Sequence, residues 1–198
     1  MRHPGKVRII GGRWRRRLLR IPDATDLRPT PDRVRETLFN WLAADLPGAR
    51  CLDLFAGSGA LGFEAASRGA SRVVLVEHDA RVAAHLVQQA AMLGAEQVQV
   101  VCADGPSWVM STQERFDVLF LDPPYGRIDV TELLARVERR GVLAADARVY
   151  VEGAADSGAD VVPAAWRCLR EQRAGRVRYH LLAPPAVDSH AADQSDGA

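Results

Sequence analysis

The residues best suited to chemistry are Asp122, Pro123, Pro124 and Tyr125, which follow one another in the chain. The two prolines lack N–H donors and stiffen the chain, while their carbonyls can still accept hydrogen bonds. An exocyclic amino group on a nucleobase needs such acceptors, because its nitrogen lone pair is delocalised into the ring. The Asp122 carboxylate and the Pro123 carbonyl could accept both N–H bonds and orient the lone pair toward an incoming methyl group. Tyr125 would stack on the base, which is worth roughly 1–3 kcal/mol. The alternative is a rigid exit from a strand.

A second candidate site is the glycine-rich stretch that follows the apolar run from Cys51 to Phe55. Gly57, Gly59 and Gly62 have G-x-G-x-x-G spacing, which lets the backbone turn tightly from strand to helix and approach a ligand closely. A nucleotide-like cofactor there would face backbone N–H groups and the positive end of a helix dipole. Alone, the pattern fits NAD, FAD, S-adenosylmethionine or an ordinary glycine-rich turn.

Further acidic residues occur where expected strands end. Asp53 precedes the glycines, and Glu77 lies 20 residues after Gly57, an offset at which a carboxylate can accept hydrogen bonds from ribose hydroxyls. Asp104 could reach an adenine amino group or cap the next helix. Because ligands of open α/β sheets bind outside the carboxyl ends of the strands, these residues indicate one site together with Asp122. A surface carboxylate at Glu77 and a plain helix cap at Asp104 are the alternatives.

The elements that would position these residues alternate along the chain. Strands are expected at 50–55, 72–77, 97–102, 116–121 and 147–152, and helices at 60–68, 80–93, 105–111 and 129–140. Such alternation predicts βαβ units and a parallel sheet covered on both faces. The runs 166–172 and 177–182 predict a closing antiparallel hairpin, although 164–172 also fits a helix. The fold class is therefore α/β.

The N-terminal region carries a concentration of positive charge. Residues 1–35 hold eleven Lys and Arg against three Asp, whereas the rest of the chain holds 15 basic and 22 acidic residues. The short runs 6–10 and 17–21 flank Gly11-Gly12-Arg13-Trp14 and predict a basic β-hairpin or arm. Arginines on both sides of Trp14 suit phosphate contacts beside a stacking face, so we expect a polyanionic partner such as RNA. Trp14 could equally pack on the domain, and the arginines could simply be solvated.

A helix should follow this arm. Thr30 is a good N-cap and Pro31 suits the first helical position, so we expect a helix from there to about Asp45. It would bury Val34, Leu38, Trp41 and Leu42, which recur at helical spacing. Of its charged residues, Arg33 could face a site, while a solvated ion pair is the more common role for any single one.

Composition limits the remaining possibilities. The 198 residues suit one domain with small attachments, and the Ala-, Asp- and Ser-rich residues 186–198 predict a disordered tail. No run of roughly 18 apolar residues occurs, so we expect no membrane span. We expect no signal peptide either. Cys51, Cys102 and Cys168 are few and far apart, which indicates a reducing compartment without a disulfide framework or zinc site. We therefore expect a cytoplasmic protein with no bound metal.

With these motifs in place, the chain resembles the class I S-adenosylmethionine-dependent methyltransferases, and among them the amino-methylating branch with the D/N-P-P-Y/F motif. More narrowly, it resembles the bacterial family that methylates guanine N2 at position 966 of 16S ribosomal RNA. The closer match is carried by Arg8–Arg15, Arg28–Thr30, Asp32–Asn40, Leu52–Gly59 and Asp122–Tyr125. His78 after Glu77 and the polar tail are mild departures.

The resemblance implies a Rossmann-like seven-stranded sheet and a basic N-terminal extension that grips ribosomal RNA. We divide the chain into an arm (1–28), a methyltransferase domain (29–185) and a tail (186–198), and expect a monomer. Together, the patterns and the resemblance assign S-adenosylmethionine binding to Asp53, Phe55, Ala56, Gly57, Ser58, Gly59, Glu77, Asp104 and Asp122. They assign catalysis to Asp122, Pro123 and Tyr125, and RNA contacts to Arg13, Trp14, Arg15, Arg16, Arg28, Thr30 and Arg33.

Other function classes remain open at this point. An adenine-N6 methyltransferase acting on DNA or RNA uses the same four-residue signature as residues 122–125, but the DNA enzymes usually need an added recognition domain for which this chain has little room. A nicotinamide oxidoreductase would share the glycine spacing but has no use for Asp122 and its prolines. A non-catalytic RNA-binding module would not need the acidic strand ends. Binding of S-adenosylmethionine rather than NAD would separate the methyltransferases from the oxidoreductase.

Overall fold

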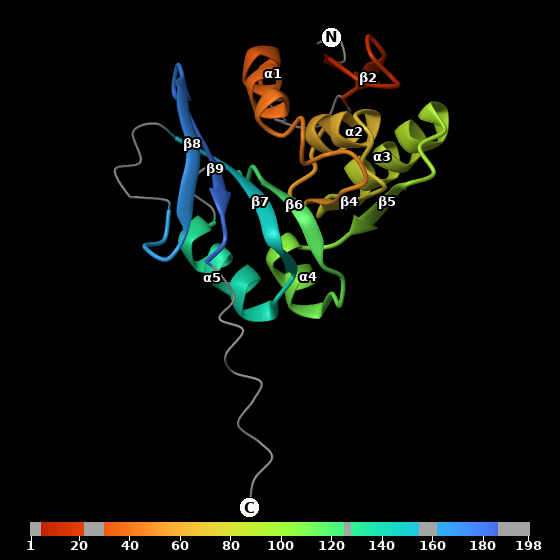
Figure 1. The fold of residues 1–198 in the computed structure, drawn as a ribbon. Helices are drawn as coiled ribbons and strands as arrows, with labels where there is room; N and C mark the ends of the chain where they lie inside the picture. Colours follow the sequence, from red (N-terminus) through yellow and green to blue (C-terminus); the bar gives the residue numbers. More distant parts are fainter. Residues whose placement is uncertain (1–4, 22–29, 125–127, 155–161, 186–198) are drawn as a thin grey trace, which may run out of the picture.

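The computed structural model describes residues 5–21, 30–124, 128–154 and 162–185, which form a large sheet with helices on both faces and a small hairpin (Figure 1). The strands of the large sheet are β3 (Arg50–Asp53), β4 (Arg72–Glu77), β5 (Val98–Cys102), β6 (Phe116–Leu121), β7 (Leu143–Ala154), β8 (Arg167–Ala174) and β9 (Val177–Ala183). The helices are α1 (Asp32–Trp41), α2 (Ala60–Ser67), α3 (Ala80–Leu93), α4 (Gly105–Ser111) and α5 (Val130–Arg140).

The large sheet has seven strands in the order β5-β4-β3-β6-β7-β9-β8. The first five of that order pair in parallel, and β9 pairs antiparallel with both β7 and β8. The expected α/β class, parallel sheet and antiparallel C-terminal hairpin are therefore confirmed. The run that also fitted a helix is strand β8, because it completes the sheet edge by pairing with β9. Strand β7 begins at Leu143, earlier than the expected residue 147.

Two apolar clusters, one on each face, hold the sheet in the middle layer. The first cluster joins the side chains on one face of β3, β4 and β6 to α1, α2 and α3. The second joins the side chains on the other face of these strands to α4 and α5. This explains the uninterrupted apolar runs in β4 and β6, because strands of a parallel sheet are buried on both sides. Figure 1 shows α4 and α5 on the opposite side of the sheet from α1 and α2. No helix in the described part of the chain is long and apolar enough to cross a membrane.

The basic arm is a hairpin of β1 (Lys6–Arg8) and β2 (Leu18–Arg20), as expected. Its apolar residues Val7, Ile9 and Leu19 are buried in the cluster that contains α1 and α2, so the arm shares the core of the domain. The arm is also tied to α2 by hydrogen bonds. The amides of Ile10 and Gly11 donate to the buried Glu64 carboxylate at 2.7 and 2.8 Å.

A buried arginine links this arm to α1. The Arg35 side chain is fully buried, donates to the Arg8 carbonyl at 2.9 Å and to Asp32 at 2.6 Å, and lies 3.8 Å from Glu64. From the sequence, a charged residue of this helix was expected to form a solvated ion pair, and the buried hydrogen bonds of Arg35 were not predicted. The network fixes the arm on α1 and α2, and it therefore gives the arm a defined position relative to the sheet.

The start of α1 differs from the expectation. Pro31 occupies the N-cap position, and no side chain caps the helix. Thr30 does not act as the cap, because its hydroxyl donates to Asp122 at 3.1 Å instead. The helix ends at Trp41, before the expected Asp45, and the chain then turns toward Pro47 and β3.

Candidate active site

Four carboxylates stand at the carboxyl ends of four neighbouring strands. Glu77 ends β4, Asp53 ends β3, Asp122 directly follows β6 and Glu152 lies near the end of β7. Side chains alternate between the faces of a strand, and these four share the face of Leu75, Cys51, Phe120 and Tyr150, all in the cluster with α1. We call Glu77, Asp53, Asp122 and Glu152 the acidic row. Three of the four strand-end carboxylates expected at one edge are thus found together; Asp104 lies outside the row, and Glu152 is an unexpected member.

Glu77 is buried and interacts with neighbouring backbone amides and with His78. Its carboxylate accepts hydrogen bonds from the amides of Gly57 at 2.9 Å and Asp79 at 2.8 Å, and it lies 2.9 Å from Nδ1 of His78. The bond to Gly57 joins the end of β4 to the glycine turn. Glu77 is therefore not the plain surface carboxylate considered as the alternative.

Asp53 is buried beside Glu77. Its Oδ2 accepts a hydrogen bond from the Gly62 amide at 3.1 Å, and burial, together with the Glu77 charge, raises its pKa to about 7. The hydrogen bonds from Gly62 and Phe55 act in the opposite direction. A carboxyl group with a pKa displaced this far is common at functional sites and costly elsewhere.

The glycine turn occupies residues 54–59, between β3 and α2, so Phe55, Ala56, Gly57, Ser58 and Gly59 lie where a cofactor loop was expected. Gly59 has φ +75°, and a Cβ there would lie 2.7 Å from the Phe63 ring. A Cβ on Gly62 would lie 2.1 Å from Leu75, so that glycine lets α2 pack closely on β4. The glycines thus allow the tight turn from strand to helix that the spacing predicted, and Gly62 brings α2 close to the sheet.

Asp104 serves as a helix cap in the structure. Its Oδ2 accepts from the Ser107 amide at 3.0 Å and from the Ser107 hydroxyl at 2.6 Å. The side chain is exposed at the end of β5. The next residue, Gly105, lies so near the glycine turn that a Cβ would be 2.7 Å from the Leu54 carbonyl oxygen. The loop after β5 therefore borders the glycine turn. Of the two roles expected for Asp104, the structure shows the helix cap.

Asp122 is half-buried and receives a hydrogen bond from a distant segment, at Thr30. Burial and the neighbouring Glu152 charge raise its pKa to about 8, and the Thr30 hydroxyl opposes that rise. Pro123 is buried and Pro124 is exposed. The predicted stacking residue Tyr125 lies outside the described residues.

Glu152 was not among the residues singled out from the sequence. Its side chain is 4% exposed, and its Oε2 accepts a hydrogen bond from the Tyr150 hydroxyl at 2.8 Å. The strand expected at 147–152 ends in this acidic residue, as the neighbouring strands end in or just before Asp53, Glu77 and Asp122, and that pattern could have identified it.

The residues expected to contact RNA fall into three groups. Arg13, Arg15, Arg16 and Arg33 are exposed. Arg28 lies outside the described residues. Trp14 is 5% exposed and packs in the core, and its amide donates to the Ser67 hydroxyl at 2.9 Å. The prediction of an exposed stacking face at Trp14 is therefore wrong, and the alternative, packing on the domain, is found. Thr30 is also buried, because it faces Asp122.

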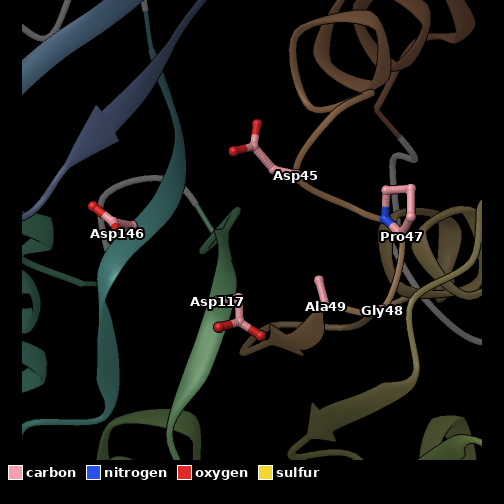
Figure 2. A pocket seen from close by; sticks show the side chains of 6 residues that line it. All are labelled: Asp45, Pro47, Gly48, Ala49, Asp117 and Asp146. Carbon is pink, nitrogen blue, oxygen red and sulfur yellow. The ribbon is translucent and has the colours of Figure 1, made fainter.

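A hollow of about 280 Å³ lies at the opposite end of the sheet, among Asp45, Pro47, Gly48, Ala49, Asp117 and Asp146 (Figure 2). Two of its three carboxylates have partners: Asp45 lies 3.3 Å from Arg148, and Asp117 accepts from the Arg50 amide at 2.7 Å. Ligands of parallel sheets bind at the carboxyl ends of the strands, so we place the site at the acidic row and not in this hollow. Among the described residues, no cluster of His, Cys, Asp and Glu is arranged to hold a metal ion.

Comparison with known proteins covers nearly the whole chain. Residues 7–183 match the model of the family described as Conserved hypothetical protein 95. The ribosomal RNA small subunit methyltransferase D of Escherichia coli (strain K12) is 45% identical over 189 residues, 96% of each chain, and the protein of the same name from Haemophilus influenzae is 40% identical over 181 residues, 89% of this chain and 93% of the relative. The solved structure of the Escherichia coli protein yhhF has a TM-score of 0.85 and 44% identity, and the match covers 92% of this chain and all of that one.

Proposed function

This chain belongs to the Conserved hypothetical protein 95 family, among class I S-adenosylmethionine-dependent methyltransferases, and from that premise we propose that it methylates the exocyclic N2 of a guanine in 16S ribosomal RNA. Relatives named for small-subunit ribosomal RNA support the substrate class, and the resemblance described above suggests position 966. The observation that carries the proposal is the acidic row, which puts a half-buried hydrogen-bond acceptor, Asp122, beside the glycine turn.

The glycine turn and the first half of the acidic row suit S-adenosylmethionine. The glycines of the turn would let the backbone approach the cofactor closely, the buried Glu77 would accept hydrogen bonds from the ribose hydroxyls, and the buried Asp53 would lie near the methionine part. Asp104 would reach the adenine amino group from the neighbouring loop. The cofactor supplies a methyl group on a positively charged sulfur, which carboxylates at this edge favour electrostatically.

The second half of the row would hold the base. Asp122 and the Pro123 carbonyl would accept the two N–H bonds of the amino group and so orient the nitrogen lone pair toward the methyl carbon, at the near-attack distance of about 3–3.5 Å. Bound S-adenosylmethionine would supply the methyl group, with the electron pair of the broken C–S bond staying on sulfur as the N–C bond forms. The methylated nitrogen then loses one proton, for which Asp122 is an adjacent acceptor. Positioning therefore contributes more than basicity.

The basic arm would hold the RNA. A guanine that is paired cannot present N2 in this way, so the target base must be unpaired or flipped out of its stack. The exposed Arg13, Arg15 and Arg16 on the arm, with Arg33 on α1, would contact phosphates. Trp14 would anchor the arm instead of stacking on a base, because its ring is buried.

Labelled methyl transfer tests the proposal directly. The full chain is incubated with labelled S-adenosylmethionine and, separately, small ribosomal subunits, naked 16S RNA and DNA, and the products are digested to nucleosides. We expect the label in N2-methylguanosine from one of the two ribosomal substrates. Label in N6-methyladenosine would instead support an adenine methyltransferase, and binding of NAD without S-adenosylmethionine in calorimetry would support an oxidoreductase.

A further inference from the structure

Glu152 has the placement of a base-reading residue. Leu121 pairs with Val151 in parallel register, so Asp122 and Glu152 are the next residues on neighbouring strands, β6 and β7 (Figure 1). Asp122 shares its face with Phe120 and Glu152 shares its face with Tyr150, and Phe120 pairs with Tyr150. The two carboxyl groups therefore stand side by side at the edge where the substrate would bind.

Two adjacent buried carboxyl groups disfavour each other's charged forms. Glu152 is 4% exposed, and its charge is the second cause, after burial, of the raised pKa of Asp122. Like charges in a poorly solvated site cost stability, and a glutamine could accept the Tyr150 hydroxyl equally well. A binding partner that offers two adjacent donors would offset this repulsion.

Guanine has that pattern of donors. Its Watson–Crick edge presents N1–H directly beside the N2 amino group, so two hydrogen-bond donors point in the same direction. Adenine and cytosine place an unprotonated ring nitrogen, an acceptor, beside their amino group. Enzymes that act on an extruded base read this edge by hydrogen bonds. A carboxylate next to Asp122 would attract guanine and repel the ring nitrogen of the other two bases.

We propose that Glu152 accepts the N1–H of the target guanine while Asp122 and Pro123 hold N2, so that Glu152 selects guanine over adenine. Glu152 is less exposed than Asp122. On guanine, N1 is a ring atom, whereas N2 projects from the ring. The more buried carboxyl group would therefore face N1–H, and the more exposed one would face the N2 amino group. The inference rests on the proposed function and adds the residue that would determine its base specificity.

The test compares guanine with 2-aminopurine, which keeps the 2-amino group but has an unprotonated N1. Small subunits are assembled with either base at the target position, and kcat/KM is measured for both. The wild-type protein should prefer guanine by about 100-fold or more, because a site built for a hydrogen bond rejects a base that lacks the donor. In Glu152→Gln the amide can donate to the unprotonated N1, so guanine methylation should fall and the preference should shrink to within about 10-fold.

The matched control is Tyr150→Phe, which removes the hydroxyl bonded to Glu152 and keeps the carboxylate. This variant should retain the preference for guanine. Equal losses on both bases in Glu152→Gln, with the preference unchanged, would overturn the inference. If the wild-type protein methylated neither base while methylating adenine, the proposed function itself would fail. Melting temperature and S-adenosylmethionine affinity confirm that each variant is folded.

Discussion

The two halves of the acidic row are built differently. Glu77 and Asp53, on the proposed cofactor side, are held by backbone amides of Gly57, Asp79 and Gly62, which lie within 20 residues of them. Asp122 and Glu152, on the proposed base side, receive side-chain hydroxyls, and the one on Asp122 comes from Thr30, 92 residues away. Backbone donors fix a carboxylate through local geometry, whereas the position of Asp122 depends on how the segment before α1 packs against the end of β6. The cofactor side should therefore be the more rigid of the two.

The largest effect should come from Asp122→Ala. If the base side acts only in positioning the amino group, kcat should fall by about 10³-fold or more, because both orientation and the charged acceptor are lost. Affinity for S-adenosylmethionine should stay within a few-fold, since Glu77 and the glycine turn are unchanged. Single-turnover transfer and calorimetry measure the two quantities. Comparable losses in both would mean that Asp122 is structural and that the halves are not separable.

The reciprocal change is Glu77→Ala. It removes the proposed acceptor for the ribose hydroxyls and the anchor of the Gly57 amide, so the dissociation constant for S-adenosylmethionine should rise by about 10–100-fold. The affinity for RNA should not change, because no part of the base side is altered. Calorimetry and filter binding check this, and a loss of RNA affinity equal to that of the cofactor would show global damage instead.

The same difference explains what could be predicted from the sequence. The glycine turn, Asp53 and Glu77 are positioned by residues close in the chain, so spacing alone located them. Strands β4 and β6 were equally readable, because burial on both faces leaves a continuous apolar run. The Thr30–Asp122 bond was not readable, since it joins residues 92 apart, and Thr30 had a local alternative as a cap. Arg35 and Trp14 were misjudged for the same reason: their burial depends on the docking of the arm against α2.

Changes in the arm should affect neither half of the row. Replacing Arg13, Arg15 and Arg16 together by Ala should weaken RNA binding by about 10-fold and lower the slope of log K against log salt by about 2–3. Transfer at saturating RNA and cofactor affinity should remain close to wild type. The matched control replaces Arg136, Arg139 and Arg140 on α5 by Ala, which removes the same number of positive charges away from the arm. An unchanged salt slope would remove the arm from the RNA site.

A smaller effect is expected from Thr30→Val, which keeps the shape of the side chain and removes its hydroxyl. The Thr30 bond lowers the pKa of Asp122, so its loss should raise that pKa beyond about 8. Because the ionised carboxylate accepts the amino group, kcat/KM should increase with pH up to a plateau, and the variant should reach it at higher pH. At pH 7 the loss should be about 3–10-fold. Thr30→Ser keeps the hydroxyl and should retain the wild-type profile; a parallel drop at every pH in Thr30→Val would indicate a packing defect.

The smallest effect concerns stability, and it compares the two halves within one measurement. The folded pKa of Asp53 is about 7 and that of Asp122 about 8, both above the usual value of 3.8 that applies when the chain unfolds. The folded protein therefore binds more protons than the unfolded chain between these values, so each group's contribution is fully present below about pH 4 and is lost as pH rises through its folded pKa. Asp53→Asn should remove the part of the decline that ends near pH 7, and Asp122→Asn the part that extends to about pH 8. At pH 8.5 both variants should have higher melting temperatures than the wild type, while at pH 4 the difference should vanish.

Thermal melts across this range measure the slope of melting temperature against pH. Identical slopes in all three proteins would mean that the acidic row carries no buried charge cost, and its carboxylates would then have no need of ligands to offset their repulsion.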